Sequence, residues 1–147
     1  TAKEIDDFFR IRNVLEVESA RLAAEKATEQ DVRELRELWQ RGIAAVEADD
    51  EPGTAAANSD FHDRVTGIAD NRVLDEMLGL LKKRLRWYFA PVARIRGRAS
   101  WDEHEALLEA IADHDPDRAG AIMAQHCAAT AALYRSAPKH EVESEAG

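Results

Sequence analysis

The residues of this chain best suited to do chemistry are histidines. The sequence has five, and three of them stand three or four residues from apolar residues of a helical pattern: His62, His104 and His126. Side chains at that spacing share one face of a helix, so each imidazole is expected to point into the protein interior. Burying three imidazoles without partners costs several kcal/mol. A divalent cation would satisfy all three, because neutral imidazole is the commonest protein ligand of such metals. The set therefore predicts either a shared metal site or three hydrogen-bonded core histidines.

Two further side chains near these histidines could be ligands. Asn58 lies four residues before His62 in the stretch ANSDFHDRV, so both side chains can point at one spot and the amide oxygen is a candidate fourth ligand. Cys127 follows His126 but lies about 100° further round a helix, which favours a small buried thiol over a metal ligand. Two histidines lie off these patterns, in an expected turn and in the C-terminal tail: His114 and His140.

Two metalloenzyme patterns are absent from the sequence. A di-iron carboxylate bundle needs Glu-x-x-His on two helices, and no glutamate here is followed by a histidine three residues later. The zinc-protease pattern H-E-x-x-H fails because Ala-Leu-Leu follows His104-Glu105. Three histidines with an open coordination position could still activate water. However, Glu103 and Glu105 are expected to point off the His104 face, so no general base is evident. A helical-bundle metalloenzyme and a purely structural dimerisation module remain alternatives.

The elements that must position these side chains all show helical periodicity, and no segment alternates like a strand. The predicted fold class is all-α, an antiparallel bundle of about six helices with short connections. The predicted helices cover residues 3–27, a segment from the cap at Thr28 to DDEPG, residues 53–69, a segment from 71 to about Pro91, a segment from Ser100, and a segment from Pro116. Residues 1–137 are expected to form one domain and residues 138–147 a disordered tail.

Three helix starts carry recognisable caps. Thr28 is followed three residues later by Asp31, which is typical of an N-cap. Ser100 and Glu103 form an S-x-x-E capping box after GRAS, residues 97–100, which is expected to be a loop. Asp115 is a good N-cap before Pro116, because proline suits the first helical position.

Composition limits the classes of partner. With 147 residues the chain is long enough for one domain with a real core. Its net charge is −9, and its one basic run, KKRLRW at residues 82–87, lies within an amphipathic pattern, so the chain is not expected to grip DNA itself. No apolar run approaches the roughly 20 residues of a membrane span. The single cysteine excludes an internal disulfide and fits a reducing, cytoplasmic location.

Four stretches together resemble a known family. They are RNVLEVESARLAAEKAT, NSDFH, GIADNRVL and SWDEHEALLEAIADHDPDRAGAIMAQH. The chain resembles the FCD domain over residues 8–135. That domain is the C-terminal effector-binding domain of FadR-type regulators in the GntR superfamily of bacterial transcription factors. The full regulators carry an N-terminal winged helix that reads operator DNA, and nothing here resembles one. The first residue is Thr1 rather than methionine, which favours a fragment.

The resemblance implies a site and its ligands. Many FCD domains hold a divalent metal, such as zinc or nickel, through an Asp or Asn and three histidines, which correspond here to Asn58, His62, His104 and His126. The resemblance also implies a small carboxylate effector bound beside the metal, and a homodimer. Arg12 stands at the arginine of the family pattern and is the first candidate to clamp the carboxylate, because arginine binds carboxylates in a bidentate manner. Arg84, with Arg86, is a second candidate.

One position departs from the commoner family pattern. Asp is commoner at the position of Asn58, and an amide oxygen is a neutral and weaker ligand than a carboxylate. The ligand set would then leave the charge of the cation uncompensated. Metal affinity is expected to be lower, and an anionic effector is expected to bind more strongly, because it supplies the missing charge.

Overall fold

The computed structural model describes residues 2–136, apart from the side chains of residues 2 and 84–94. Within this range the chain forms helices and no strand, which confirms the predicted all-α class. The helices are α1 (Ala2–Lys26), α2 (Glu29–Glu47), α3 (Glu51–Ala69), α4 (Arg72–Ala112) and α5 (Pro116–Ser136). Gly97 interrupts α4 with a φ of 40° and a ψ of −126°, so α4 consists of two helical parts and the bundle has six helices, as predicted. The predicted tail, 138–147, lies outside the described residues.

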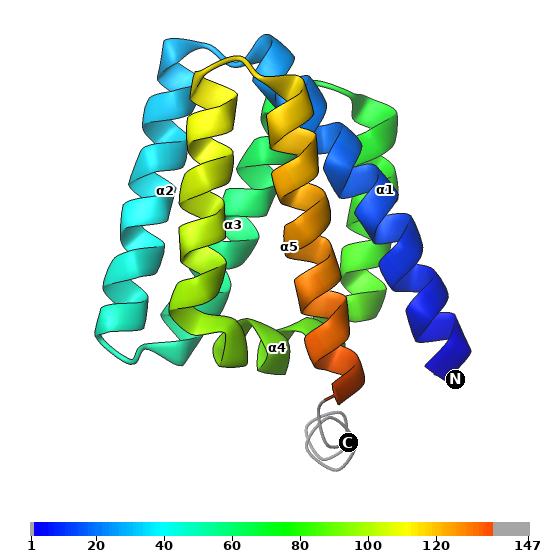
Figure 1. Cartoon of the computed structure of the whole chain (residues 1–147). Coiled ribbons are helices and arrows are strands. Elements are labelled where there is room, and N and C mark those ends of the chain that lie inside the picture. The colour runs from blue at the N-terminus through cyan, green and yellow to red at the C-terminus, as the bar shows by residue number, and fades with distance from the viewer. Residues whose placement is uncertain (1, 137–147) are drawn as a thin grey trace.

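The helices lie side by side around a shared interior (Figure 1). α1 packs against α3, α4 and α5, while α2 packs against α3 and α4. The last part of α4, drawn in yellow, runs between α2 and α5. None of the helices within residues 2–136 is long and apolar enough to cross a bilayer.

The buried apolar side chains form two clusters. The larger one draws on α1, α2, α3, the last part of α4 and α5, and it includes Leu35, Phe61, Trp101, Leu107 and Met123. The smaller one joins the end of α3 and the first part of α4 to α1 through Ala69, Leu74, Leu78, Leu15 and Leu22. Among the described side chains of α4, those of the first part that belong to a cluster lie in the smaller one and those of the last part in the larger one.

Two of the three predicted caps are confirmed. Thr28 accepts a hydrogen bond from the backbone N–H of Asp31, whose carboxylate in turn accepts one from the Thr28 N–H, so the pair is a full capping box. Asp115 caps α5 by accepting from the N–H of Arg118 at 2.9 Å.

The predicted loop at residues 97–100 and its cap at Ser100 are wrong. The backbone leaves the helical region at Gly97 alone, and residues 98–100 are already helical. A positive φ is open to glycine without a steric cost, so the chain changes direction within a single residue. Ser100 is consequently a helical residue of α4 rather than its cap, and it is buried, with 6% of its surface exposed. Pro91 does not end α4 either, because the helix continues past it to the break at Gly97.

Candidate metal centre

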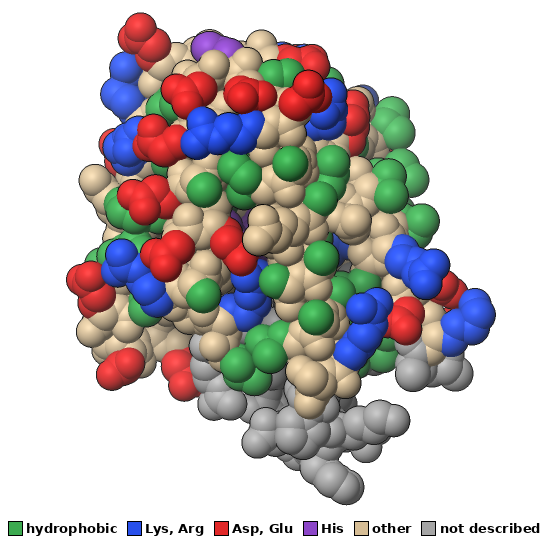
Figure 2. Space-filling view, viewed as in Figure 1, with side chains coloured by type: hydrophobic (Ala, Val, Ile, Leu, Met, Phe, Trp, Pro, Cys, Tyr) green, Lys and Arg blue, Asp and Glu red, His purple; other side chains and the backbone are tan. Residues whose placement is uncertain are grey.

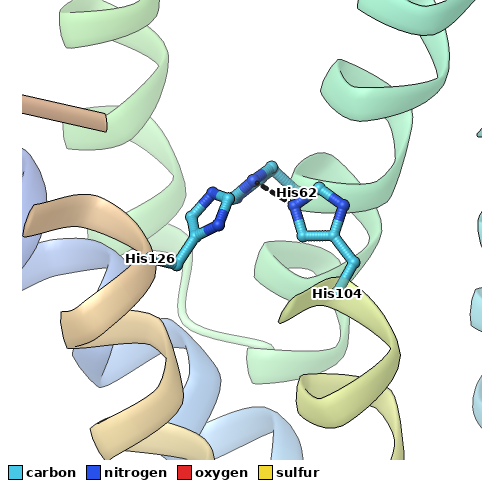
Figure 3. Close-up of side chains that lie close together, drawn as sticks. All are labelled: His62, His104 and His126. Atoms are coloured by element: carbon cyan, nitrogen blue, oxygen red, sulfur yellow. Dashed lines mark hydrogen bonds between the residues drawn. The ribbon is translucent and has the colours of Figure 1, made fainter. Parts of the chain in front are cut away.

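The three inward histidines meet at one point in the bundle. His62 comes from α3, His104 from the last part of α4 and His126 from α5, and Figure 3 shows their rings converging between these helices. Each offers a ligand nitrogen, and these nitrogens all lie within 4.8 Å of one another. The three side chains are only 1–4% exposed, so the cluster is closed to bulk water.

The closest approach in the cluster has a spacing suited to metal ligands. Nε2 of His104 lies 3.2 Å from Nε2 of His62. Two nitrogens bound at 2.0–2.1 Å to a tetrahedral zinc ion lie about 3.3–3.4 Å apart. Nδ1 of His104 is buried and has no hydrogen-bond partner among the described residues. The described residues therefore leave one buried ring nitrogen of the cluster without a partner.

Aromatic rings fix the orientation of His104. Its imidazole is stacked on Phe61, with ring centroids 4.6 Å apart and an interplanar angle of 17°. The ring of Trp101 meets it edge-on at 4.7 Å and 89°. Trp39 holds the Trp101 backbone by donating from Nε1 to its carbonyl oxygen at 3.0 Å. Burial lowers the pKa of His104 well below its usual range, so its imidazole is neutral and able to bind a cation.

A buried glutamate from α1 holds His62. Oε2 of Glu16 lies 3.0 Å from Nδ1 of His62, and Oε1 accepts a hydrogen bond from Nε of Arg12 at 3.1 Å. The Glu16 side chain is 2% exposed. Burial alone would raise the pKa of Glu16, but His62 and Arg12 outweigh that effect and hold it well below its usual range. The Glu16 carboxylate therefore stays ionised within the protein interior.

A second glutamate holds His126. Oε2 of Glu103 lies 2.7 Å from Nδ1 of His126, and both carboxylate oxygens accept from Nη2 of Arg96, at 2.5 and 2.6 Å. Arg96 also donates to the carbonyl oxygen of His126 and to the hydroxyl of Thr130. Burial lowers the pKa of His126 to about 4, although its bond to Glu103 acts in the opposite direction. Glu103 was expected to point off the His104 face, and its side chain reaches His126 rather than His104.

The structure brings some predicted site residues together and leaves others apart. Asn58 lies on α3 one turn before His62 with a half-buried side chain, and its role as a fourth ligand stays a prediction. Arg12 reaches the cluster through Glu16. The side chains of Arg84 and Arg86 lie outside the described residues. Two described candidates are not in the cluster: Cys127 is a buried free thiol, and His114, in the turn between α4 and α5, contacts the carbonyl oxygen of Ala24 on α1. His140 lies outside the described residues.

Sequence reasoning missed the charged residues behind the histidines. Glu16 lies four residues after Arg12 and four before Ala20, so a carboxylate occupies a buried face of α1 with a cation one turn away. A charged side chain at a core position needs a partner. The four-residue spacing between Arg12 and Glu16 could have identified Arg12 as that partner. Arg96 and Glu103 gave no such signal, because their contact depends on the break at Gly97.

Comparison with known proteins decides the family. The family model described as "FCD domain" matches residues 7–129. The chain belongs to the FCD domain family. The resemblance inferred from the four sequence stretches is therefore confirmed, and the match covers all three clustered histidines.

Two curated relatives are regulators of transcription. The chain is 27% identical over 133 residues to the HTH-type transcriptional regulator LutR of Bacillus subtilis (strain 168), a match that covers 84% of this chain and 59% of the relative. It is 26% identical over 131 residues to the Nta operon transcriptional regulator of Aminobacter aminovorans, covering 85% and 59%. This chain thus spans about three fifths of the length of the curated relatives that it matches.

Two solved structures share the fold. Streptococcus agalactiae GntR superposes with a TM-score of 0.72 at 24% identity and covers 89% of this chain and 58% of its own. E. coli McbR/YncC gives a TM-score of 0.80 at 24% identity and covers 92% and 66%. The family identifies the chain as a regulatory, effector-binding domain and not as an enzyme, so the metalloenzyme alternative is set aside.

Proposed function

We propose that this chain is the sensing domain of a GntR-type transcriptional regulator, in which Asn58, His62, His104 and His126 hold a divalent metal and a small carboxylate binds beside it. One observation carries the proposal: three buried histidines from three helices place their ligand nitrogens within 4.8 Å of one another. A bound cation would supply a Lewis-acidic positive charge to which a carboxylate oxygen binds.

The charges around the cluster favour an anionic effector. The three histidines and Asn58 are neutral ligands, so they leave the charge of a cation uncompensated. The positive charges of Arg12 and Arg96 act on the cluster as well, and both help to lower the pKa values of His104 and His126. Glu16 and Glu103 already pair with these arginines, so a carboxylate effector would respond mainly to the metal, with Arg12 as the candidate clamp that the family pattern suggests.

An exposed apolar surface supports the proposal of a homodimer. On α1 it includes Ile11 and Val14, which are 51% and 65% exposed, and on the first part of α4 it includes Val73, Met77 and Leu80, which are 46–67% exposed. Figure 2 shows hydrophobic side chains along the right-hand edge of the molecule, where these two helices lie. An exposed apolar stripe of this kind marks an interaction site. A second copy of the chain would cover it, while a winged helix outside this chain would read the operator DNA.

The first test is the metal content of the purified protein. Elemental mass spectrometry is expected to find about one divalent metal per chain, and a His62→Ala/His104→Ala double variant is expected to lose it. Small carboxylates are then screened by thermal shift on the metal-loaded protein, and Arg12→Gln is expected to weaken the shift. If neither protein takes up zinc, nickel or manganese, the histidines are structural and the proposed function fails.

A further inference from the structure

Two of the three imidazoles are held from behind by carboxylates. Nδ1 of His62 faces Oε2 of Glu16 at 3.0 Å, and Nδ1 of His126 faces Oε2 of Glu103 at 2.7 Å. An ionised carboxylate only accepts hydrogen bonds, so each Nδ1 must carry the hydrogen. In a neutral ring that carries its hydrogen on Nδ1, the lone pair lies on Nε2, the nitrogen through which His62 meets His104.

A competing contact does not change this assignment for His126. Nη1 of Arg96 lies 3.3 Å from the same Nδ1 and would donate to it if Nδ1 carried the lone pair. That arrangement would set the lone pair against Oε2 of Glu103 at 2.7 Å, the shorter and charge-assisted contact. Arg96 already has three other acceptors, including the hydroxyl of Thr130 at 2.9 Å. The Nδ1–H tautomer therefore satisfies more groups.

Each carboxylate in turn accepts hydrogen bonds from an arginine, so the site has two hydrogen-bonded Arg–Glu–His groups. Arg12, Glu16 and His62 form one, with side chains only 2–12% exposed. Arg96, Glu103 and His126 form the other, in which the arginine and the histidine are 8% and 6% exposed and the glutamate is 26% exposed. Because each glutamate is paired with a cation, its negative charge can persist beside the histidine at low water content.

We propose that Glu16 and Glu103 are positioning residues that set the metal affinity of the cluster. This inference rests on the proposed function. Each one fixes the tautomer and ring orientation of a ligand and makes that ligand more basic. Their negative charges are paired with Arg12 and Arg96, so the two glutamates act on the ligand rings and do not replace the negative charge that Asn58 lacks. The commoner carboxylate at position 58 would place that charge directly on the metal.

The test compares four glutamate-to-glutamine variants. Glu16→Gln and Glu103→Gln keep the shape of the side chain and remove its charge, and both are expected to raise the zinc dissociation constant about 10- to 100-fold. Glu18→Gln and Glu105→Gln are the controls, since both residues are exposed neighbours on the same two helices. Affinity is measured on metal-stripped protein by competition with a chromophoric chelator. Equal affinities in all four variants would overturn the inference.

A second measurement needs no variant and no metal. Nitrogen-15 NMR of the metal-free wild-type protein reports the tautomer of each assigned histidine, and His62 and His126 are expected to be protonated on Nδ1. Protonation on Nε2 in these two rings would overturn the inference even if the variants fail to fold. The two failures are distinguishable: a wild-type protein that takes up no metal refutes the proposed function, whereas a metal-binding protein with the wrong tautomers refutes only this step.

Discussion

Gly42 on α2 faces the indole ring that holds His104, and replacing it with alanine should disturb both. A Cβ at this position would approach Cη2, Cζ2 and Cζ3 of Trp101 more closely than 3.0 Å, a contact that real Cβ atoms essentially never show. Trp101 has little room to move away, because its side chain is 1% exposed and its ring packs edge-on against both Phe61 and His104. The extra methyl group therefore overpacks the core.

The magnitude follows from two opposing effects. Overpacking of a close-packed core costs about 1–3 kcal/mol, while alanine gains about 0.8–1.0 kcal/mol over glycine in a helix. Gly42→Ala is therefore expected to lower the free energy of unfolding by up to about 2 kcal/mol. Gly79→Ala on α4 is the matched control, because a Cβ there meets nothing within 4 Å. The control should gain stability, so the difference between the two variants isolates the overpacking cost of about 1–3 kcal/mol.

Urea denaturation of metal-free protein, followed by circular dichroism, measures that difference. Zinc affinity is measured in parallel, because a displaced Trp101 ring should shift His104 and weaken metal binding in Gly42→Ala but not in Gly79→Ala. If the two variants are equally stable, the packing argument for Trp101 is refuted.

Three further predictions concern stability, pH and thiol reactivity. Thr28→Ala removes the side-chain half of the capping box and should lower the free energy of unfolding by about 1 kcal/mol in urea titrations; no change would show that Asp31 caps α2 alone. Because the pKa of His126 is about 4 in the fold and about 6.5 when unfolded, the unfolded state binds the extra proton, so stability is present above pH 6.5 and is lost as pH falls towards 4. In metal-free protein the titration of His126 should by itself cost roughly 2–3 kcal/mol over that range, so His126→Gln should show a shallower loss; equal slopes would contradict the assignment. Burial raises the pKa of Cys127 to about 12, so Ellman's reagent should react with it only after unfolding, and rapid reaction with the native protein would refute that burial.

Helix caps and the inward faces of helices were predictable from the sequence, whereas individual side-chain contacts between distant segments were not. The caps at Thr28 and Asp115 depend on residues within three positions of each other, and both were predicted correctly. The convergence of the three histidines was also predictable, because each lies on an apolar face and those faces must pack together.

The errors cluster around Gly97. The Ser-x-x-Glu pattern is typical of a capping box at the start of a helix. It therefore predicted that Ser100 is an N-cap and that Glu103 is its partner in the capping box. The backbone turns at Gly97 instead, which frees Glu103 to join Arg96 and His126. The direction of a helix after a glycine break depends on tertiary packing, and no single-sequence periodicity encodes it.

The division of the apolar core into two clusters has a consequence for how the protein opens. Residues 72–83 of α4 are attached to α1 through the small cluster of Leu74 and Leu78, whereas His104 packs on Phe61 and Trp101 of the larger cluster. Free energies of local opening scale with the apolar contacts that must be broken. The amide hydrogens of residues 72–83 should therefore exchange with solvent through a partial unfolding that leaves the histidine cluster and Arg96 in place. Sensing and the exposed α1–α4 surface would then lie in units of different local stability within one domain.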